Sequence, residues 1–272
     1  MNKHSILLRA ILLAACFVAS MRMALAQDFK AYRGNIPGSY NYWFYDPQTE
    51  PDPNAHYPLL IFLHGKSLCG TDLNQVKRYG PISAVASGRV IDSYIMAPQN
   101  PGGSWNPEKV WRIVEWAKEK YPVDTTRIYV YGMSLGGYGT IDMAATYPDK
   151  IAAAVGMCGG ATKKDLSGLA KLPLWIIHGT ADKSVRVDAS DRVVKAIKDT
   201  GDSSRLIYDR LPGVDHSTLA RMFYMLITYD WLFSHSLNDP NREVNRNFVL
   251  TKDMIKDAYR DIRKKVPEVE PE

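Results

Sequence analysis

The chain has 272 residues, of which 34 are basic and 29 acidic, and its formal net charge is +5. A chain of this length with 46% hydrophobic residues can bury one substantial core. No basic run with interleaved aromatic residues occurs in the sequence, which argues against nucleic acid as the main partner.

Residues 1–26 have the pattern of an export signal. Two basic residues precede an apolar run from Ala10 to Val18, and Ala24 and Ala26 supply the small residues of a cleavage site. The run is too short to span a bilayer, so we expect a chain exported to the periplasm or secreted, with no membrane span. Lipidation is the alternative, because Leu13–Cys16 resembles a lipoprotein processing site. Cleavage after Ala26 removes three basic residues and no acidic one, which lowers the net charge to +2.

Residues 27–237 alternate between strand-like and helix-like segments and form one expected domain. Apolar β-rich runs predict strands at Tyr40–Tyr45, Leu59–Leu63, Tyr94–Ala97, Arg127–Tyr131, Ala152–Met157, Leu174–Ile177 and Arg205–Tyr208. Helical patterns lie between them at Asp72–Tyr79, Pro107–Lys120, Gly136–Tyr147, Val187–Asp199 and Leu219–Phe233. This alternation predicts an α/β fold with a mostly parallel sheet and helices on both faces. Ligands of such sheets bind at the carboxyl ends of the strands.

Residues 238–272 differ in character and are predicted to be a C-terminal appendage. The segment after Leu237 is polar and rich in turn residues, and Thr251–Lys265 has the pattern of a charged helix. We expect this helix to pack on the surface of the domain, with a partner-binding helix as the alternative.

The sequence GMSLGG, Gly132–Gly137, follows a predicted strand and opens a predicted helix. This strand, turn and helix setting is that of a nucleophile elbow, in which the serine has strained dihedral angles and its neighbours must be small. The amide of Leu135, at the start of the helix, points to where an oxyanion would form. Ser134 is therefore the candidate nucleophile, and a glycine-rich turn without function is the alternative.

A serine nucleophile needs a base, and the base needs an acid that orients it. Asp182 lies in the turn after one predicted strand, and His216 lies in a loop after the next strand. These positions predict a Ser-His-Asp triad. Two competing acids are less suitable, because Asp188 falls within a predicted helix and the side chain of Asp215 diverges from that of its neighbour His216.

A second oxyanion donor is expected after the strand that ends at His64 and Gly65. Gly65 lets the chain bend, so the backbone amide of Lys66 can turn toward the site. His64 is expected to brace this loop by hydrogen bonding, with a metal ligand or a base as the alternative.

The sequence holds no group of His, Cys and carboxylates at metal-ligand spacing, so we expect no metal and no cofactor. Whether Cys69 and Cys158 pair is left open.

These segments resemble the α/β-hydrolase superfamily, on the motifs FLHG, APQ, RIYVYGMSLGGYGT, LWIIHGTAD and GVDHS in this order. Within it they are similar to the esterases that include polyhydroxybutyrate-depolymerase-like enzymes, esterase D and the family 1 carbohydrate esterases, among them feruloyl and acetyl xylan esterases. The resemblance implies the same nucleophile, acid, base and oxyanion amides as the residues assigned above. The chain departs from the family at Lys66, where a small residue is common, so the entrance there is more crowded and more positive.

The segment Cys158–Pro173 has only 16 residues, which is too short for the large cap domain of many lipases of the superfamily. An open site suits bulky or polymer-attached esters, and Trp105 is predicted to lie against an acyl or sugar group, with a role in plugging its loop as the alternative. By analogy we expect an exported serine esterase acting on acyl or feruloyl esters of plant polysaccharide. A secreted peptidase of the same fold and a catalytically idle glycan-binding module are the alternatives.

Overall fold

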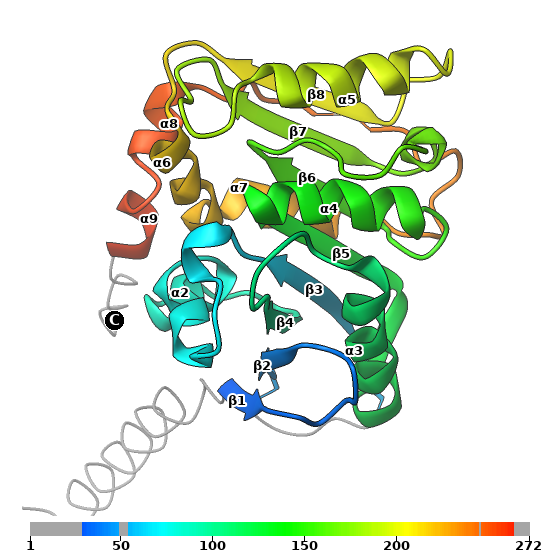
Figure 1. Ribbon diagram of the computed structural model, residues 1–272, viewed down its shortest axis with the longest axis vertical. Helices are drawn as coiled ribbons and strands as arrows, with labels where there is room; N and C mark the ends of the chain where they lie inside the picture. Colours follow the sequence, from blue (N-terminus) through cyan, green and yellow to red (C-terminus); the bar gives the residue numbers. More distant parts are fainter. Residues whose placement is uncertain (1–28, 49–53, 245, 264–272) are drawn as a thin grey trace, which may run out of the picture.

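The computed structural model describes residues 29–48, 54–244 and 246–263, and the expected export signal and cleavage site lie outside these residues. The described residues form an eight-stranded sheet in the order β1-β2-β4-β3-β5-β6-β7-β8 (Figure 1). The strands are β1 (Phe29–Tyr32), β2 (Asn41–Tyr45), β3 (Tyr57–Leu63), β4 (Tyr94–Gln99), β5 (Val123–Met133), β6 (Ala153–Met157), β7 (Leu174–Gly179) and β8 (Leu206–Leu211). The pairs β1–β2 and β2–β4 are antiparallel, and every other neighbouring pair is parallel.

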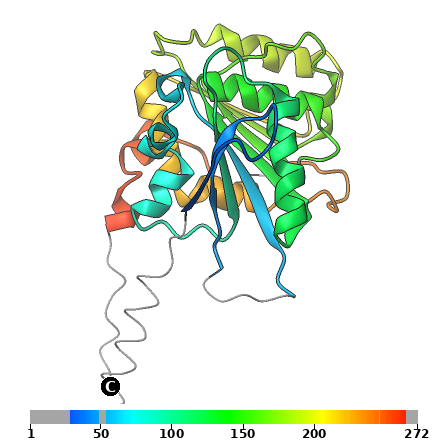
Figure 2. The ribbon, with the colours of Figure 1, turned by 60° about the horizontal axis from the view of Figure 1, so that its bottom comes forward.

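Helices cover both faces of the sheet, as expected for a parallel sheet whose strands are buried on both sides (Figures 1 and 2). The residues of α3, α4 and α5 share one hydrophobic cluster, and those of α2 and α7 share the other. The α-helices are α2 (Pro81–Ala86), α3 (Pro107–Lys120), α4 (Leu135–Thr146), α5 (Asp188–Lys198), α6 (His216–Leu219), α7 (Leu226–Phe233), α8 (Lys252–Lys256) and α9 (Arg260–Arg263). The 3-10 helices are η1 (Lys66–Leu68), η2 (Leu73–Arg78), η3 (Ser167–Lys171) and η4 (Ala220–Tyr224). None of the helices in the described part of the chain is long and apolar enough to cross a membrane.

Alternation along the central strands divides the core into these two clusters. In β3, Leu60 and Phe62 belong to one cluster, whereas Leu59, Ile61 and Leu63 belong to the other. All five side chains are fully buried, because successive residues of a strand point to opposite faces and both faces are covered. This is why the strand has an unbroken apolar sequence.

Two predicted helices differ in the structure. The segment predicted as one helix from Leu219 to Phe233 is divided among α6, η4 and α7, because Met225 has extended dihedral angles and interrupts it. The segment predicted as a helix from Asp72 to Tyr79 is the 3-10 helix η2. The short elements β1 and α2 were not predicted, since four to six residues carry too little periodicity to distinguish them from loops.

The predicted C-terminal helix also differs, because the described residues from Thr251 onward form two short helices, α8 and α9, in place of one. Thr251 caps α8 by accepting a hydrogen bond from the amide of Met254, and Ile255 in this helix is fully buried. In Figure 1 α8 lies beside α6 on the body of the domain.

Candidate active site

Ser134 lies in a sharp turn between β5 and α4 at the carboxyl end of the sheet. Its φ and ψ are 60° and −123°, a strained combination for a residue with a side chain. Close approach of the chain explains the neighbouring glycines: a Cβ atom at Gly136 would lie 1.7 Å from the carbonyl oxygen of Leu63, and one at Gly137 would lie 2.2 Å from that of Met157. The turn therefore holds the serine in one conformation that larger neighbours would not permit.

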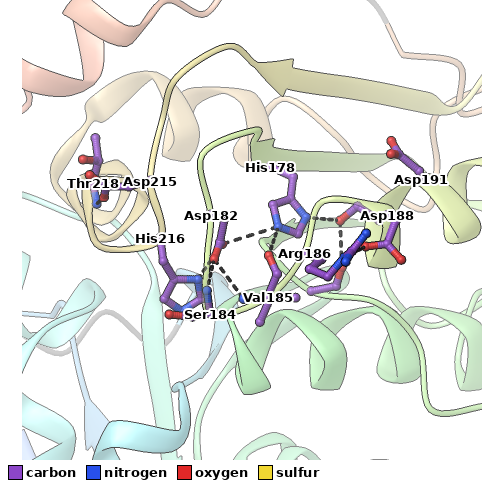
Figure 3. Close-up of polar contacts among 12 residues, drawn as sticks. His178, Asp182, Ser184, Val185, Arg186, Asp188, Asp191, Asp215, His216 and Thr218 are labelled. Carbon is purple, nitrogen blue, oxygen red and sulfur yellow. Dashed lines mark hydrogen bonds and ion pairs between the residues drawn. The ribbon is translucent and has the colours of Figure 1, made fainter.

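Asp182 lies in the turn after β7, and His216 is the first residue of α6, which follows β8. The two side chains contact each other (Figure 3). The Nδ1 atom of His216 lies 2.6 Å from Oδ2 of Asp182. Because a carboxylate oxygen accepts hydrogen bonds, Nδ1 carries the proton and Nε2 keeps a free lone pair. The Asp182 side chain is completely buried, whereas that of His216 is 22% exposed.

Three further groups fix the carboxylate of Asp182, two amides of the turn after β7 and the side chain of His178 on β7 (Figure 3). Its Oδ1 atom accepts hydrogen bonds from the amides of Ser184 at 2.8 Å and Val185 at 2.9 Å. His178 lies on the other side, with Nε2 3.4 Å from Oδ2, and the same nitrogen donates to the carbonyl of Val185 at 2.9 Å. A carboxylate held by these groups can orient the imidazole of His216 without rotating.

The two competing acids have other partners. Asp215 caps α6 by accepting a hydrogen bond from the amide of Thr218 at 2.8 Å. Asp188 bonds to the exposed guanidinium groups of Arg186 and Arg192, and these contacts lower the pKa of its carboxyl group. Both side chains point away from His216 in Figure 3, so Asp182 is the acid that contacts this histidine.

Ser134 and His216 line one open pocket with a volume of about 570 Å³. Its walls come from the turns at the carboxyl ends of the strands and from two tyrosines, and they comprise residues 65–67, 133–135, 184–185 and 216–217 with Tyr79, Tyr138 and Ala220. Lys66 is the one cationic side chain among these lining residues, and no carboxylate is among them.

Lys66 and Leu135, the two expected oxyanion donors, both border this pocket. Each is the first residue of a helix, η1 and α4 respectively, and the first amides of a helix have no partner within it. The loop before Lys66 is fixed by Tyr79, whose hydroxyl accepts a 2.6 Å hydrogen bond from the amide of Gly65.

His64 lies behind this loop and is fully buried. Its Nε2 accepts from the amide of Asn100 at 3.0 Å, so its Nδ1 carries the proton and donates to the carbonyl of Gly65 at 2.7 Å. Burial lowers the pKa of His64 to about 4. The imidazole is therefore neutral and joins two loops, in agreement with the expected bracing role.

Comparison with known proteins places these residues in a family context. A model of the Dienelactone hydrolase family matches residues 107–229. A solved thermostable esterase is 26% identical with a TM-score of 0.63, and the match covers 77% of this chain and 63% of that one. The chain has the α/β-hydrolase fold.

The curated relatives of this α/β-hydrolase include acetylxylan esterases and a poly(3-hydroxyalkanoate) depolymerase. A probable acetylxylan esterase A of Aspergillus clavatus is 29% identical, with 59% of this chain and 53% of that protein covered. Poly(3-hydroxyalkanoate) depolymerase C of Paucimonas lemoignei is 28% identical, with 60% of this chain and 42% of that protein covered. The α/β-hydrolase thus spans about half the length of these relatives.

The α/β-hydrolase has no large cap over its pocket in the described residues. The segment between β6 and β7 holds the short helix η3. The fold is shared with a feruloyl esterase module from Clostridium thermocellum, at 15% identity and a TM-score of 0.56, covering 83% of this chain and 92% of that one.

The structure does not place Trp105 at the described pocket, where the substrate-contact prediction expects it. Its side chain is 3% exposed and does not border the described pocket. The indole donates a 3.2 Å hydrogen bond to the carbonyl of His64, and its ring packs edge-on against the ring of Tyr40, 5.2 Å away. A Cβ atom at Gly139 would come within 2.7 Å of the indole, so Trp105 joins its loop to α4. These contacts agree with the alternative, in which Trp105 packs its loop against the core.

Cys158 approaches the Asp182–His216 pair, although no sequence spacing predicted a cluster. Its sulfur, a carboxylate oxygen of Asp182 and a ring nitrogen of His216 lie within 4.8 Å of one another, an arrangement that can hold a metal ion. Burial and the nearby carboxylate raise the pKa of the Cys158 thiol, so the sulfur keeps its proton. The imidazole of His216 and the carboxylate of Asp182 are hydrogen-bonded to each other. Cys158 and Cys69 are both free thiols, so they do not form a disulfide.

The sequence argument overlooked His178 and Tyr79. His178 precedes a glycine at the end of a strand in HGTAD, as His64 does in FLHG, and this shared pattern was the available signal. Tyr79 carried no signal, because it lies 14 residues from Gly65 and only the fold brings its hydroxyl to the loop.

Proposed function

We propose that this α/β-hydrolase is an exported serine esterase that cleaves acyl or feruloyl esters of plant polysaccharide through an acyl-enzyme on Ser134. The observation that carries the proposal is the 2.6 Å contact between Asp182 and His216 in the pocket region that Ser134 also borders. Export rests on the signal pattern of residues 1–26.

In the first half of the reaction, Nε2 of His216 takes the hydroxyl proton of Ser134 while Oγ attacks the ester carbonyl carbon. The carbonyl oxygen becomes an oxyanion, which accepts hydrogen bonds from the backbone amides of Lys66 and Leu135. His216 is then an imidazolium, and Asp182 stabilises its charge. When the tetrahedral intermediate collapses, His216 gives the proton to the departing alcohol and the acyl group stays on Ser134.

In the second half, water takes the place of the alcohol. His216 removes a proton from this water, the hydroxide attacks the acyl carbon, and the same two amides stabilise the second oxyanion. Collapse returns the proton from His216 to Oγ of Ser134 and releases the carboxylic acid. The net reaction consumes one water molecule and needs neither metal nor redox chemistry.

The substrate class is proposed from the shape of the site and from the relatives. The pocket is open and uncapped, so an ester that projects from a polymer can reach Ser134. Acetylxylan esterases and a poly(3-hydroxyalkanoate) depolymerase are among the relatives, and both names refer to polymeric esters. A pocket of this volume accommodates an acetyl or a cinnamoyl group.

Hydrolysis of p-nitrophenyl acetate by the purified chain and by the variants Ser134→Ala and Ser217→Ala tests the proposal. We expect Ser134→Ala to abolish turnover with an unchanged circular dichroism spectrum, and Ser217→Ala, a second pocket serine, to keep most of it. A fluorophosphonate should label Ser134 alone. Labelling of another serine, or full activity of Ser134→Ala, would contradict the assignment.

A substrate panel separates the esterase from its alternatives. We expect acetylated xylan fragments and methyl ferulate to be cleaved with higher kcat/KM than peptide amides or long-chain triglycerides. Preference for peptides would favour the peptidase of the same fold. Xylan binding without turnover of any ester would favour the idle glycan-binding module.

A further inference from the structure

The C-terminal segment, residues 238–244 and 246–263, runs from the amino ends of the strands to their carboxyl ends. At its start the guanidinium of Arg242 donates to the carbonyls of Pro148 and Ala152, both at 3.0 Å, at the amino end of β6. Toward its end, α8 contacts α6, the helix that begins at His216. Figures 1 and 2 both show α8 beside α6, at the carboxyl ends of the strands.

Between these ends the segment is anchored to the sheet by Arg246. Its guanidinium pairs with the carboxylate of Asp209 on β8, with 2.9 Å between Nη2 and Oδ1. Asp209 also accepts a 2.7 Å hydrogen bond from the indole of Trp175 on β7, and the guanidinium lies over that ring at 5.3 Å. The side chains of Arg246 and Asp209 are only 15% and 10% exposed, so this anchor is largely shielded from water.

Lys252 at the start of α8 contacts the loop that carries His216. Its ammonium donates a 2.7 Å hydrogen bond to the carbonyl of Gly213, three residues before His216. The amide of Gly213 donates in turn to the hydroxyl of Thr180 at 3.0 Å, in the turn that leads to Asp182. Gly213 is thus held on one side by the turn of the acid and on the other side by the C-terminal segment.

A second contact lies just beyond α6. The guanidinium of Arg221 donates to the carbonyl of Lys256 at 3.0 Å and lies over the ring of Tyr259. Ile255, between these contacts, is fully buried in the same hydrophobic cluster as Val214 and Leu219. Because Val214 precedes His216 and Leu219 follows it, α8 packs against the chain on both sides of the histidine.

We propose that the C-terminal segment is a positioning element for His216, acting through the contacts of Lys252 and Arg221 with the chain on either side of it. The inference rests on the proposed function, in which His216 is the base. The imidazole is partly open to solvent, so the position of its ring depends on the backbone that carries it. Misplacement of a reacting group by about 1 Å can cost up to about 100-fold in rate, so loosening this backbone should lower kcat.

The variants Lys252→Met, Arg221→Met and the double variant test this inference in the full chain. Methionine keeps most of the apolar stem and removes the charge. Lys256→Met is the matched control, because the Lys256 ammonium bonds only to Asp253 within α8 among the described residues. We expect kcat for p-nitrophenyl acetate to fall about 3- to 10-fold in each single variant and about 30-fold in the double variant, with KM unchanged. Lys252→Arg should restore most of the loss.

A proton NMR measurement separates positioning from general stability. The Nδ1 proton of His216, shared with Asp182, should give a low-field resonance that broadens in Lys252→Met and Arg221→Met but not in Lys256→Met. Wild-type kcat and an unchanged resonance in the double variant would overturn the inference. So would a loss of kcat that follows a fall in melting temperature and is not restored by Lys252→Arg. If the wild type hydrolyses no ester while the resonance still broadens, the proposed function fails and the positioning role stands.

Discussion

At the scale of single residues, the buried carboxylate of Asp182 carries the most specific arrangement of polar contacts. Two amides hold Oδ1, and Oδ2 faces His216. The amide in Asp182→Asn keeps the shape of the carboxylate. Because the two backbone amides at Oδ1 require an acceptor there, the NH2 group of the asparagine faces the imidazole. The ring would then favour the tautomer with the proton on Nε2, which cannot accept the proton of Ser134.

We therefore expect Asp182→Asn to lower kcat for p-nitrophenyl acetate by about 10⁴-fold. Asp188→Asn is the control, since Asp188 is half exposed and its ion pairs within the described residues are with Arg186 and Arg192. Steady-state kinetics of the two variants checks the prediction. A loss of less than tenfold in Asp182→Asn would mean that another group orients His216.

The buried position of Trp105 predicts that its substitution lowers stability and affects all ester substrates alike. Its indole is buried against α4 and bonded to the carbonyl of His64, so Trp105→Ala should create a cavity that loosens the loop before Lys66. We expect a loss of about 3 to 5 kcal/mol in the free energy of unfolding, measured in urea. The values of kcat/KM for aryl and acetyl esters should fall by the same factor. A selective loss for aryl esters would restore a substrate-binding role.

At the scale of elements, the C-terminal segment depends on one largely buried ion pair. Arg246→Met removes the ionic partner of Asp209. It leaves a carboxylate that is 10% exposed and that keeps the indole of Trp175 as its hydrogen-bond donor within the described residues. Breaking such a pair costs several kcal/mol because the remaining charge stays buried, so we expect a loss of about 2 to 4 kcal/mol in the free energy of unfolding. Arg186→Met, at an exposed pair, should change it by less than about 1 kcal/mol. Equal losses of unfolding free energy in Arg246→Met and Arg186→Met would contradict this prediction. They would show that water hydrates the carboxylate of Asp209 when Arg246 is removed.

At the scale of the whole molecule, buried histidines make stability depend on pH. Burial lowers the pKa values of His178 and His235 and brings that of His64 to about 4. Between pH 6.5 and 4 these histidines bind more protons in the unfolded chain than in the folded chain. Their contribution to stability is therefore fully present above this window and is lost as the pH falls through it. His64 alone should remove about 1 kcal/mol between pH 7.5 and 5.5.

Urea unfolding at these two pH values checks the prediction. The exposed His56 provides the control, because His56→Gln should leave the difference between the two pH values unchanged, whereas His64→Gln should reduce it. Equal stability of the wild type at pH 7.5 and 5.5 would contradict a buried neutral His64.

The central strands and the long helices followed from the sequence because each has a clear local signal. Leu59–Leu63 is apolar without interruption because both faces are covered, and α3 begins at Pro107, as its pattern predicts. Positions after strands also identified Asp182 and His216, since parallel strands end at one edge of a sheet. The fold brings these two side chains into contact, with 2.6 Å between Nδ1 and Oδ2. The short elements β1 and α2 were missed because their few residues show no period.

Local patterns in the sequence predict the order of the central strands and long helices and the residues that follow the strands. The burial of Trp105, the approach of Cys158 to the Asp182–His216 pair and the contact of Lys252 with the loop before His216 appear only in the folded chain. They depend on contacts between residues that are far apart in the sequence. Periodicity and turn chemistry act over a few residues, whereas the contact between Lys252 and Gly213 joins groups 39 residues apart, which become neighbours only when the helices pack on the sheet.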